Sequence, residues 1–366
     1  MKFKEIYLKK DEVVPDSGTK KVDLRLDVPI QSLRVIYKQT PSGADYDDHP
    51  IYKDVDKIEV VDGSEVIFSL NGRQCLGLNF YERGRLPDAK ICNKNGVENF
   101  QVFEINFARD ERDDELGFDP RRYRNPVLQL THTFETGTGK WTANGTKLTV
   151  IARVLDVQSA SPRGVLMTKE IYSYTMGTSG EHTIELPRDY PYRLLGIQTL
   201  LSGNTFEENV SNVKLTCDMD RFVPFNYRAE DFIRIIKEKF GIGIEILSQN
   251  KKDNEVIYSQ FQNVLNAHVR PSNDLNIANV ESIDAEKITL QVLKLTTSPS
   301  IAKANTDQLI YGQAQGIEPH GLVAWNFGTM QDMNSWFDPR NYQTVQLKLT
   351  QSAAAECAII LQQLKM

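Results

Sequence analysis

The segment FDPRRYRNPVLQLT, residues 118–131, returns later in the chain as FDPRNYQTVQLKLT, residues 337–350. Eight of the fourteen aligned positions are identical, and the match has no gap. An Asp-Pro pair favours a turn, so we expect a structural signature in which Phe anchors a turn and Tyr opens the next strand. The signature residues are Phe118, Asp119, Pro120, Arg121 and Tyr123, and then Phe337, Asp338, Pro339, Arg340 and Tyr342.

A second match lies near the front of each half, where KEIY at residues 4–7 returns at residues 169–172. Because the matches occur in the same order in both halves, the sequence predicts two copies of one domain. We expect the first domain at residues 1–155, a linker rich in Ser, Pro and Gly at 156–165, and the second domain at 166–366.

The two predicted copies differ in length. From Asp27 to Phe118 the chain advances 91 residues, whereas from the matching Asp189 to Phe337 it advances 148. We expect the surplus to form a long loop insertion at about 249–321, because insertions of this length are usually surface segments.

Hydrophobic residues mostly alternate with polar ones, as at Val22, Leu24 and Leu26. Alternation of this kind predicts strands with one face on a core, and Asn-Gly and Asp-Gly pairs between the runs predict hairpin turns. We therefore expect an all-β fold of two tandem antiparallel jelly-roll sandwiches. We also interpret the stretch Leu76 to Phe80 as a strand.

Two segments have helical features. Residues 228–240 place apolar side chains at helical spacing before Gly241, so we predict one short helix in the second copy, without a counterpart in the first. Propensity also favours a helix at 353–364. The repeat aligns residues 356–364 with a strand, and we follow the repeat.

Composition is ordinary for a globular protein, with 40% hydrophobic and 25% charged residues. The net charge of −6 argues against packaging of nucleic acid, and no direct nucleic-acid binding is expected. The four cysteines form no C-x-x-C pair, and we interpret them as buried free thiols in a reducing compartment.

Motifs for catalysis are largely missing from the sequence. Residues 137–140 resemble a phosphate loop, but Phe134 and Trp141 stand where that motif needs Gly and Ser or Thr. We expect no catalytic residue and no cofactor. Asp45, Asp47 and Asp48 are a weak candidate for a metal site, and a solvated acidic loop is the preferred interpretation.

Charges of both signs gather between residues 109 and 124. This segment is either a salt-bridged network within the chain or a charge loop between subunits, where complementary charge sets register. The basic residues of this loop are Arg109, Arg112, Arg121, Arg122 and Arg124. At the N-terminus, Lys2, Lys4, Lys9 and Lys10 form a basic tip that either is solvated or touches an anionic surface.

Two tandem jelly rolls, with the duplicated segments 118–131 and 337–350 each leading into a late strand, resemble the double jelly-roll major capsid proteins of tailless icosahedral viruses. Many of these viruses, bacteriophages among them, contain a membrane. The resemblance implies a homotrimer of pseudo-hexagonal outline that contacts neighbouring trimers and penton or minor capsid proteins. It also implies a place in the virion after synthesis in the host cytoplasm, with the basic tip facing an inner membrane.

Two other functions remain open at this point. A carbohydrate-active hydrolase on paired jelly rolls needs two convergent carboxylates, and the sequence offers Glu135, Glu181, Glu185 and Asp189 without a reason to pair any two. A glycan-binding protein would use the 249–321 insertion, which carries few aromatic residues.

Overall fold

The structure is a computed structural model of the chain. It describes the backbone of all residues except 1–2, 43–49, 91–95, 157–160, 202, 252–256, 260–262, 272–275, 285–286, 296–300 and 304–307, and it describes no side chains between 245 and 315. Asp45, Asp47, Asp48, Lys2, Cys92 and part of the expected linker therefore lie outside the described residues.

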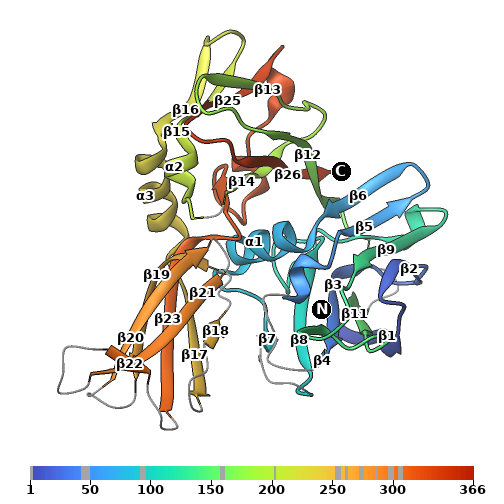
Figure 1. The fold of residues 1–366 in the computed structure, drawn as a ribbon. Helices are drawn as coiled ribbons and strands as arrows, with labels where there is room; N and C mark the ends of the chain where they lie inside the picture. The colour runs from blue at the N-terminus through green and yellow to red at the C-terminus, as the bar shows by residue number, and fades with distance from the viewer. Residues whose placement is uncertain are drawn as a thin grey trace.

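The first half of the chain forms one jelly roll of two facing sheets (Figure 1). One sheet has the strand order β1-β11-β3-β8-β7, and the other begins β2-β9-β5-β6. Its strands are β1 (Phe3–Val13), β2 (Ser17–Asp23), β3 (Ile30–Gln39), β5 (Lys57–Asp62), β6 (Glu65–Leu70), β7 (Ala89–Lys90), β8 (Asn99–Asn106), β9 (Pro126–Thr133) and β11 (Lys147–Leu155), with a small pair β4 (Pro41–Ser42) and β10 (Lys140–Trp141).

The second half repeats this arrangement strand for strand. Its sheets have the orders β12-β26-β14-β24 and β13-β25-β15-β16, which match β1-β11-β3-β8 and β2-β9-β5-β6. The strands are β12 (Val165–Thr175), β13 (Glu181–Glu185), β14 (Tyr192–Leu200), β15 (Val210–Cys217), β16 (Phe222–Arg228), β24 (Leu322–Asn326), β25 (Val345–Gln351) and β26 (Glu356–Lys365). The strand that the repeat predicts at the C-terminus is confirmed as β26.

The two jelly rolls share one sheet. Strand β6 of the first pairs in parallel with β12 of the second, with Phe68 opposite Thr168 and Ser69 opposite Lys169. The result is an eight-stranded sheet, β2-β9-β5-β6-β12-β26-β14-β24, that runs through both halves. This junction fixes how one jelly roll stands beside the other.

A helix in the first half corrects our strand interpretation of residues 76–80. Helix α1 (Gly72–Arg83) begins with a capping box between Asn71 and Gln74, and every residue from Gln74 to Tyr81 is buried. A helix that is buried on all sides has no amphipathic period, so the sequence pattern could not reveal it. In Figure 1 α1 lies between the two jelly rolls.

The helix predicted in the second half is confirmed as α3 (Ala229–Phe240), which ends at Gly241 with φ 78°. It follows β16 directly, as α1 follows β6, so the first copy does have a counterpart. The short helices of the chain are η1 (Ile51–Lys53), η2 (Pro120–Arg122), α2 (Phe206–Asn209), η3 (Met333–Ser335) and η4 (Pro339–Asn341). No helix among the described residues is long and apolar enough to span a membrane.

The segment expected as a loop insertion carries strands, and we call residues 243–319 the tower. One sheet has the order β17-β23-β19, and the other has β18-β21-β20 with β22 on β21. The strands are β17 (Gly243–Lys251), β18 (Ile257–Ser259), β19 (Asn263–Pro271), β20 (Asn276–Asp284), β21 (Lys287–Leu295), β22 (Ile301–Lys303) and β23 (Gln308–Pro319). Ile288, Leu290 and Val292 alternate with other residues along β21, a pattern typical of a strand that the argument from insertion length did not take into account.

Candidate assembly interface

The duplicated signature forms the same turn in both jelly rolls. Asp119 caps η2 by accepting hydrogen bonds from the Arg121 backbone N–H at 3.1 Å and from its Nε at 2.8 Å. Asp338 caps η4 through the same two groups of Arg340 at the same two distances. Burial opposes ionisation of Asp119, but the hydrogen bonds from Arg121 outweigh burial and lower the pKa of the carboxyl.

The aromatic residues of the signature join this turn to the start of β3 or β14. The backbone of Phe118 exchanges two hydrogen bonds with Ile30, at 2.8 and 2.7 Å. Phe337 exchanges the same pair with Tyr192, at 3.2 and 2.8 Å. Each Phe ring also stacks on the signature Tyr, with centroids 4.7 Å apart in the first copy and 5.6 Å in the second.

A further duplicated pair, Asp62 and Asp218, escaped the sequence comparison. Asp62 accepts the backbone N–H of Asn125 at 2.7 Å, and Asp218 accepts that of Thr344 at 3.0 Å. Each acid thereby binds the turn before β6 or β16 to the backbone segment that follows the signature. The Asp62-Gly63 turn signal was visible, but Asp218 is followed by Met219 and so carries no such signal.

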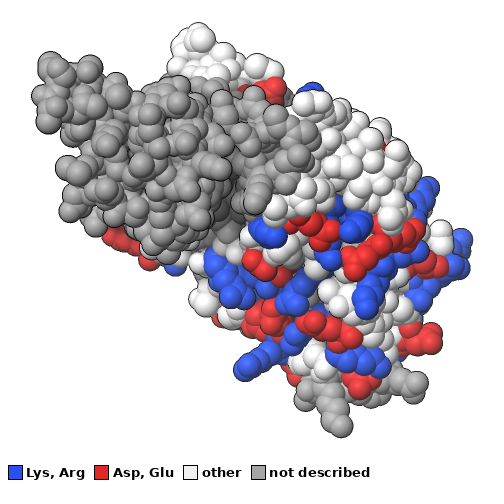
Figure 2. Space-filling model, turned by 60° about the horizontal axis from the view of Figure 1, so that its bottom comes forward, with Lys and Arg blue, Asp and Glu red and all other residues white. Residues whose placement is uncertain are grey.

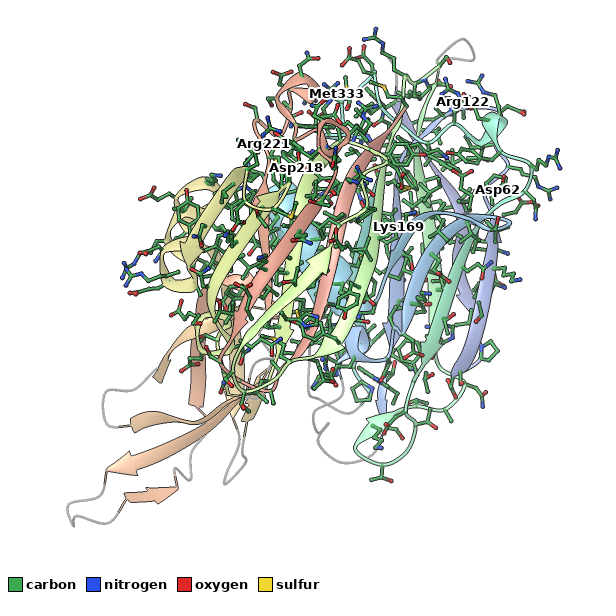
Figure 3. The ribbon with its side chains drawn as sticks, turned by 90° about the horizontal axis from the view of Figure 1, so that it is seen from above. Asp62, Arg122, Lys169, Asp218, Arg221 and Met333 are labelled. Carbon is green, nitrogen blue, oxygen red and sulfur yellow. The ribbon has the colours of Figure 1, made fainter. Side chains whose placement is uncertain are left out.

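These turns lie at the end of the jelly rolls that is opposite the tower. In Figure 3 Arg122, Asp218, Arg221 and Met333 lie toward the upper end of the view and the tower lies at the lower left. The molecule therefore has a signature end and a tower end.

The structure separates the arginines of the charge loop into one that bonds within the chain and four that are exposed. Arg109 bonds within the chain, to Asp113 at 2.7 Å, to Glu115 at 2.6 Å and to the carbonyl of Gln331 in the second jelly roll at 2.8 Å. These acids raise the pKa of Arg109, most of all through the hydrogen bond that Asp113 accepts from it. The intramolecular alternative accounts for Arg109.

The other four arginines of the loop have exposed side chains. Arg121 contacts Asp119, and Arg122 donates to the carbonyl of Pro162 at 2.7 Å. The backbone N–H of Arg112 donates to the Asp110 carboxylate, and that of Arg124 donates to the Asp62 carboxylate. These four remain candidates for contacts between subunits.

A buried arginine holds the two jelly rolls together. Arg193 of β14 is 1% exposed, and its guanidinium donates to Gln362 at 2.6 Å, to the Arg109 carbonyl at 3.1 Å and to the Met330 carbonyl at 3.1 Å. Glu82 of α1 lies 4.0 Å away. Burial lowers the pKa of Arg193 to about 10, which still leaves it charged at neutral pH.

Lys4, Lys9 and Lys10 belong to strand β1 and not to a free tip. Lys4 pairs with Asp156 at 2.7 Å, Lys9 pairs with Glu12 at 2.9 Å, and the Lys10 ammonium lies 5.4 Å from the centre of the Tyr7 ring. On the face seen in Figure 2 basic and acidic side chains are intermixed.

Groups suited to chemistry are scattered. Among the described residues no three His, Cys, Asp or Glu side chains gather as a metal site. Cys75, Cys217 and Cys357 are buried and free, and burial raises the pKa of Cys217 to about 11 and that of Cys357 to about 12. Of the carboxylates considered for a hydrolase, Glu135 pairs with Lys140 and Glu181 with Lys348, whereas Glu185 and Asp189 line one groove beside β12.

Exposed apolar side chains gather along two strand edges. Strand β1 exposes Tyr7 and Val13, at 61% and 62%, and β16 exposes Phe222 and Val223. Met219 lies in the turn before β16, and Ile242 and Ile244 follow α3. In the part of the chain that the structure describes, β1 pairs with β11 alone and β16 with β15 alone.

A duplicated jelly roll with a shared sheet defines the class of protein, the double jelly-roll proteins. Among solved structures, the major capsid protein P2 from Bacteriophage PM2 matches with a TM-score of 0.56 at 10% identity, covering 100% of this chain and 97% of that chain. The MCP of STIV matches with a TM-score of 0.60 at 10% identity, covering 100% and 97%. PBCV-1 VP54, fitted into a reconstruction of the virophage Sputnik, matches with a TM-score of 0.59 at 10% identity, covering 99% of this chain and 93% of that chain.

The sequence itself matches no family model and no curated protein. At 10% identity the structural likenesses establish the fold, which is the double jelly roll of these capsid proteins along almost their whole length. The fold class predicted from the repeat is therefore confirmed.

Proposed function

We propose that the chain is the major capsid protein of an icosahedral virus and that it assembles as a trimer of nearly hexagonal outline. The observation that carries this proposal is the duplication itself. Three copies of a chain with two equivalent jelly rolls supply six similar domains around one axis, and a closed ring of six tiles a surface. The likeness to solved capsid proteins over whole chains supports it.

The rest of the proposal follows from this role. The trimers contact one another and penton or minor capsid proteins in the virion, after synthesis in the host cytoplasm. The exposed side chains of Arg112, Arg121, Arg122 and Arg124 act between subunits. Lys2, Lys4, Lys9 and Lys10 contact an inner membrane, and the tower points away from it. The role requires no catalysis, cofactor or nucleic-acid contact.

The test is the mass of the purified full chain in solution, measured by light scattering, with negative-stain images of the same peak. We expect a species of three times 41.6 kDa with a hexagonal outline. A monomer that persists at high concentration would contradict the proposal and favour the hydrolase alternative. The groove with Glu185 and Asp189 would then be probed with glycan and glycopeptide substrates.

A further inference from the structure

Within one chain, the contact between β6 and β12 joins two equivalent domains. We propose that the same contact joins neighbouring copies, so that β16 of one copy lies along β1 of the next and three copies close into a ring. This inference rests on the proposed function and names the surfaces by which the trimer forms. The partner is a second copy of this chain.

Strand pairing establishes which elements correspond. In the first copy Val60 of β5 has Phe68 of β6 on one side and Leu128 of β9 on the other. In the second copy Leu215 of β15 has Phe225 of β16 and Leu347 of β25. Leu128 and Leu347 are identical positions of the duplicated segment, so β16 is the counterpart of β6. By the same comparison of sheet orders, β1 is the counterpart of β12.

The internal junction uses one member of each counterpart pair, and among the residues that the structure describes nothing pairs with the corresponding edge of the other member. It joins β6 to β12, and the unused edges are those of β16 and β1. A free edge strand presents unpaired backbone groups, which proteins normally cover or block. A junction of β16 with β1 covers both edges at once, and repeating one junction around an axis leaves neither edge open in a closed ring.

The distribution of exposed apolar side chains favours the edges of β1 and β16 over the other sheet edges as contact sites. The described part of the chain exposes nine large hydrophobic side chains, and seven of them lie on β1, on β16 or in the segments that flank β16 and α3. Edges β2 and β13, which are also counterparts of each other, carry none of them. Apolar side chains that gather on a soluble protein mark contact sites.

Helices α1 and α3 follow β6 and β16, and the burial of each agrees with the strand face that it meets or would meet, β14 for α1 and β3 of the next copy for α3. Helix α1 is buried, and its Glu82 reaches Arg193 of β14 and Gln362 of β26, so β14 is buried on both faces except at its last residue. The counterpart of β14 is β3, which leaves Arg34 and Lys38 partly exposed.

Helix α3, the counterpart of α1, exposes charged side chains of both signs, among them Glu230, Arg234, Lys237 and Glu238. A buried helix thus meets a buried sheet face inside the chain. In the proposed ring a charged helix meets the charged face of the next copy, where Arg34 already bridges Glu5 and Glu104 at 3.1 Å each.

The pairing of β6 with β12 also predicts the register of the proposed contact between β16 and β1. Phe68 and Ser69 lie opposite Thr168 and Lys169, and the counterparts on β16 are Phe225 and Asn226. On β1 the counterparts fall within residues 3–6. The match of residues 4–7 with 169–172 places them at residues 3 and 4, whereas the pairing of β12 with β26 and of β1 with β11 places them at residues 5 and 6. Asn226 of one copy should therefore lie beside residues 3–6 of the next copy.

Disulfide trapping in the full chain tests this register. In a Cys92→Ser background the remaining cysteines are buried, and Asn226→Cys is combined in turn with Phe3→Cys, Lys4→Cys, Glu5→Cys or Ile6→Cys. Neighbouring strands lie about 4.8 Å apart, within the Cα separation of a disulfide. We expect at least one pair to give covalent trimers on a non-reducing gel, and reduction to return them to monomers.

The matched control is Asn226→Cys with Thr19→Cys, which is exposed on β2 and should give no covalent product. If the variants are trimeric by light scattering and none of the four pairs cross-links, the β16–β1 contact is wrong while the capsid proposal stands. If the unmodified chain is monomeric, both proposals fall together. Cross-linking equal to that of the Thr19 control would also overturn the contact.

Discussion

Arg193 of β14 donates a hydrogen bond to the backbone carbonyl of Arg109, 3.1 Å away, so a side chain of the second jelly roll is held by the backbone of the first. The same guanidinium binds Gln362 and the carbonyl of Met330. The orientation of the two jelly rolls therefore depends on the buried Arg193 guanidinium as well as on the shared sheet.

Replacing Arg193 should destabilise the chain. Arg193→Met keeps the apolar volume but leaves the carbonyls and Glu82 without their cation, and losing one partner of a buried ion pair costs about 3 kcal/mol or more. We expect that loss in the free energy of unfolding measured with denaturant. Arg340→Met, at a position 58% exposed, is the control and should cost under about 1 kcal/mol. Equal losses of unfolding free energy in Arg193→Met and Arg340→Met would show that the buried contacts of Arg193 add no more stability than a surface ion pair.

The contact of α1 with the second jelly roll requires a glycine. A Cβ on Gly77 would lie 2.8 Å from Leu322 Cδ2 and 2.9 Å from the Pro319 carbonyl oxygen. Gly77→Ala should therefore lower stability by about 1–3 kcal/mol through overpacking, although alanine favours helices by about 1 kcal/mol elsewhere. Arg234→Ala, at the matching position of α3, should change the melting temperature little. A stabilised Gly77→Ala chain would disprove the close contact.

Both turn acids, Asp62 and Asp218, should contribute to stability. Each accepts two backbone N–H groups, and replacement by Ala removes both acceptors at a partly solvated site. We expect Asp62→Ala to cost about 1 kcal/mol in denaturant unfolding, and Asp218→Ala to cost more, because φ of 50° at Asp218 is a left-handed conformation that alanine disfavours. Asn at either position should restore part of the loss, and an unchanged stability in either Ala variant would contradict the role of that acid.

Glu318 should make stability depend on pH. It is 2% exposed at the end of the tower, and its carboxyl oxygen Oε2 accepts a hydrogen bond from the Phe206 N–H at 2.9 Å. Burial, with a smaller effect of Glu207 and Glu208, raises its pKa to about 8. The folded chain keeps this proton until about pH 8, whereas the unfolded chain releases it near pH 4.3. The contribution of Glu318 is thus complete below about pH 4 and is lost as the pH rises through 8.

Glu318→Gln cannot ionise and should not lose this contribution. The stability of Glu318→Gln minus that of the native chain should rise between pH 5 and pH 8 and then level off, on the order of a few kcal/mol. Thermal unfolding across that range measures the difference, with Glu356→Gln as an exposed control. A difference that does not vary with pH would refute a buried, protonated Glu318.

Charge reversal at Arg121 and Arg122 tests the role of the charge loop. Both side chains are partly exposed, at 35% and 48%, so Arg121→Glu with Arg122→Glu should weaken trimers in light scattering without unfolding the monomer. Arg340→Glu in the second copy is the matched control. Intact trimers in the double variant would restrict these arginines to contacts inside the chain.

Sequence reasoning found the features that the duplication repeats. The signature led to the two-domain fold, and the repeat correctly placed a strand at Glu356–Lys365 against the helical propensity of that segment. The signature turn is set by local chemistry, an Asp-Pro pair and the Arg that bonds back to it. Short-range patterns of this kind are visible in a sequence.

The sequence missed what depends on the contact between domains. Leu76 to Phe80 looked like a strand because α1 is covered on every side, by β8 of the first jelly roll and by β24 of the second. Arg193 is an ordinary residue in an apolar strand until Gln362 and Arg109, far away in the chain, meet it. Side chains whose partners lie in another domain leave no local pattern to detect.

The tower belongs to the second copy alone, and this makes the two halves unequal in one respect. A ring of six similar domains would carry three towers, at every second position. Any partner that binds a tower would meet three identical sites at fixed spacing on each capsomer, so weak single contacts would add up through avidity. In the proposed capsid, duplication with one decorated copy would thus set the valency of the outer surface independently of the lattice beneath it.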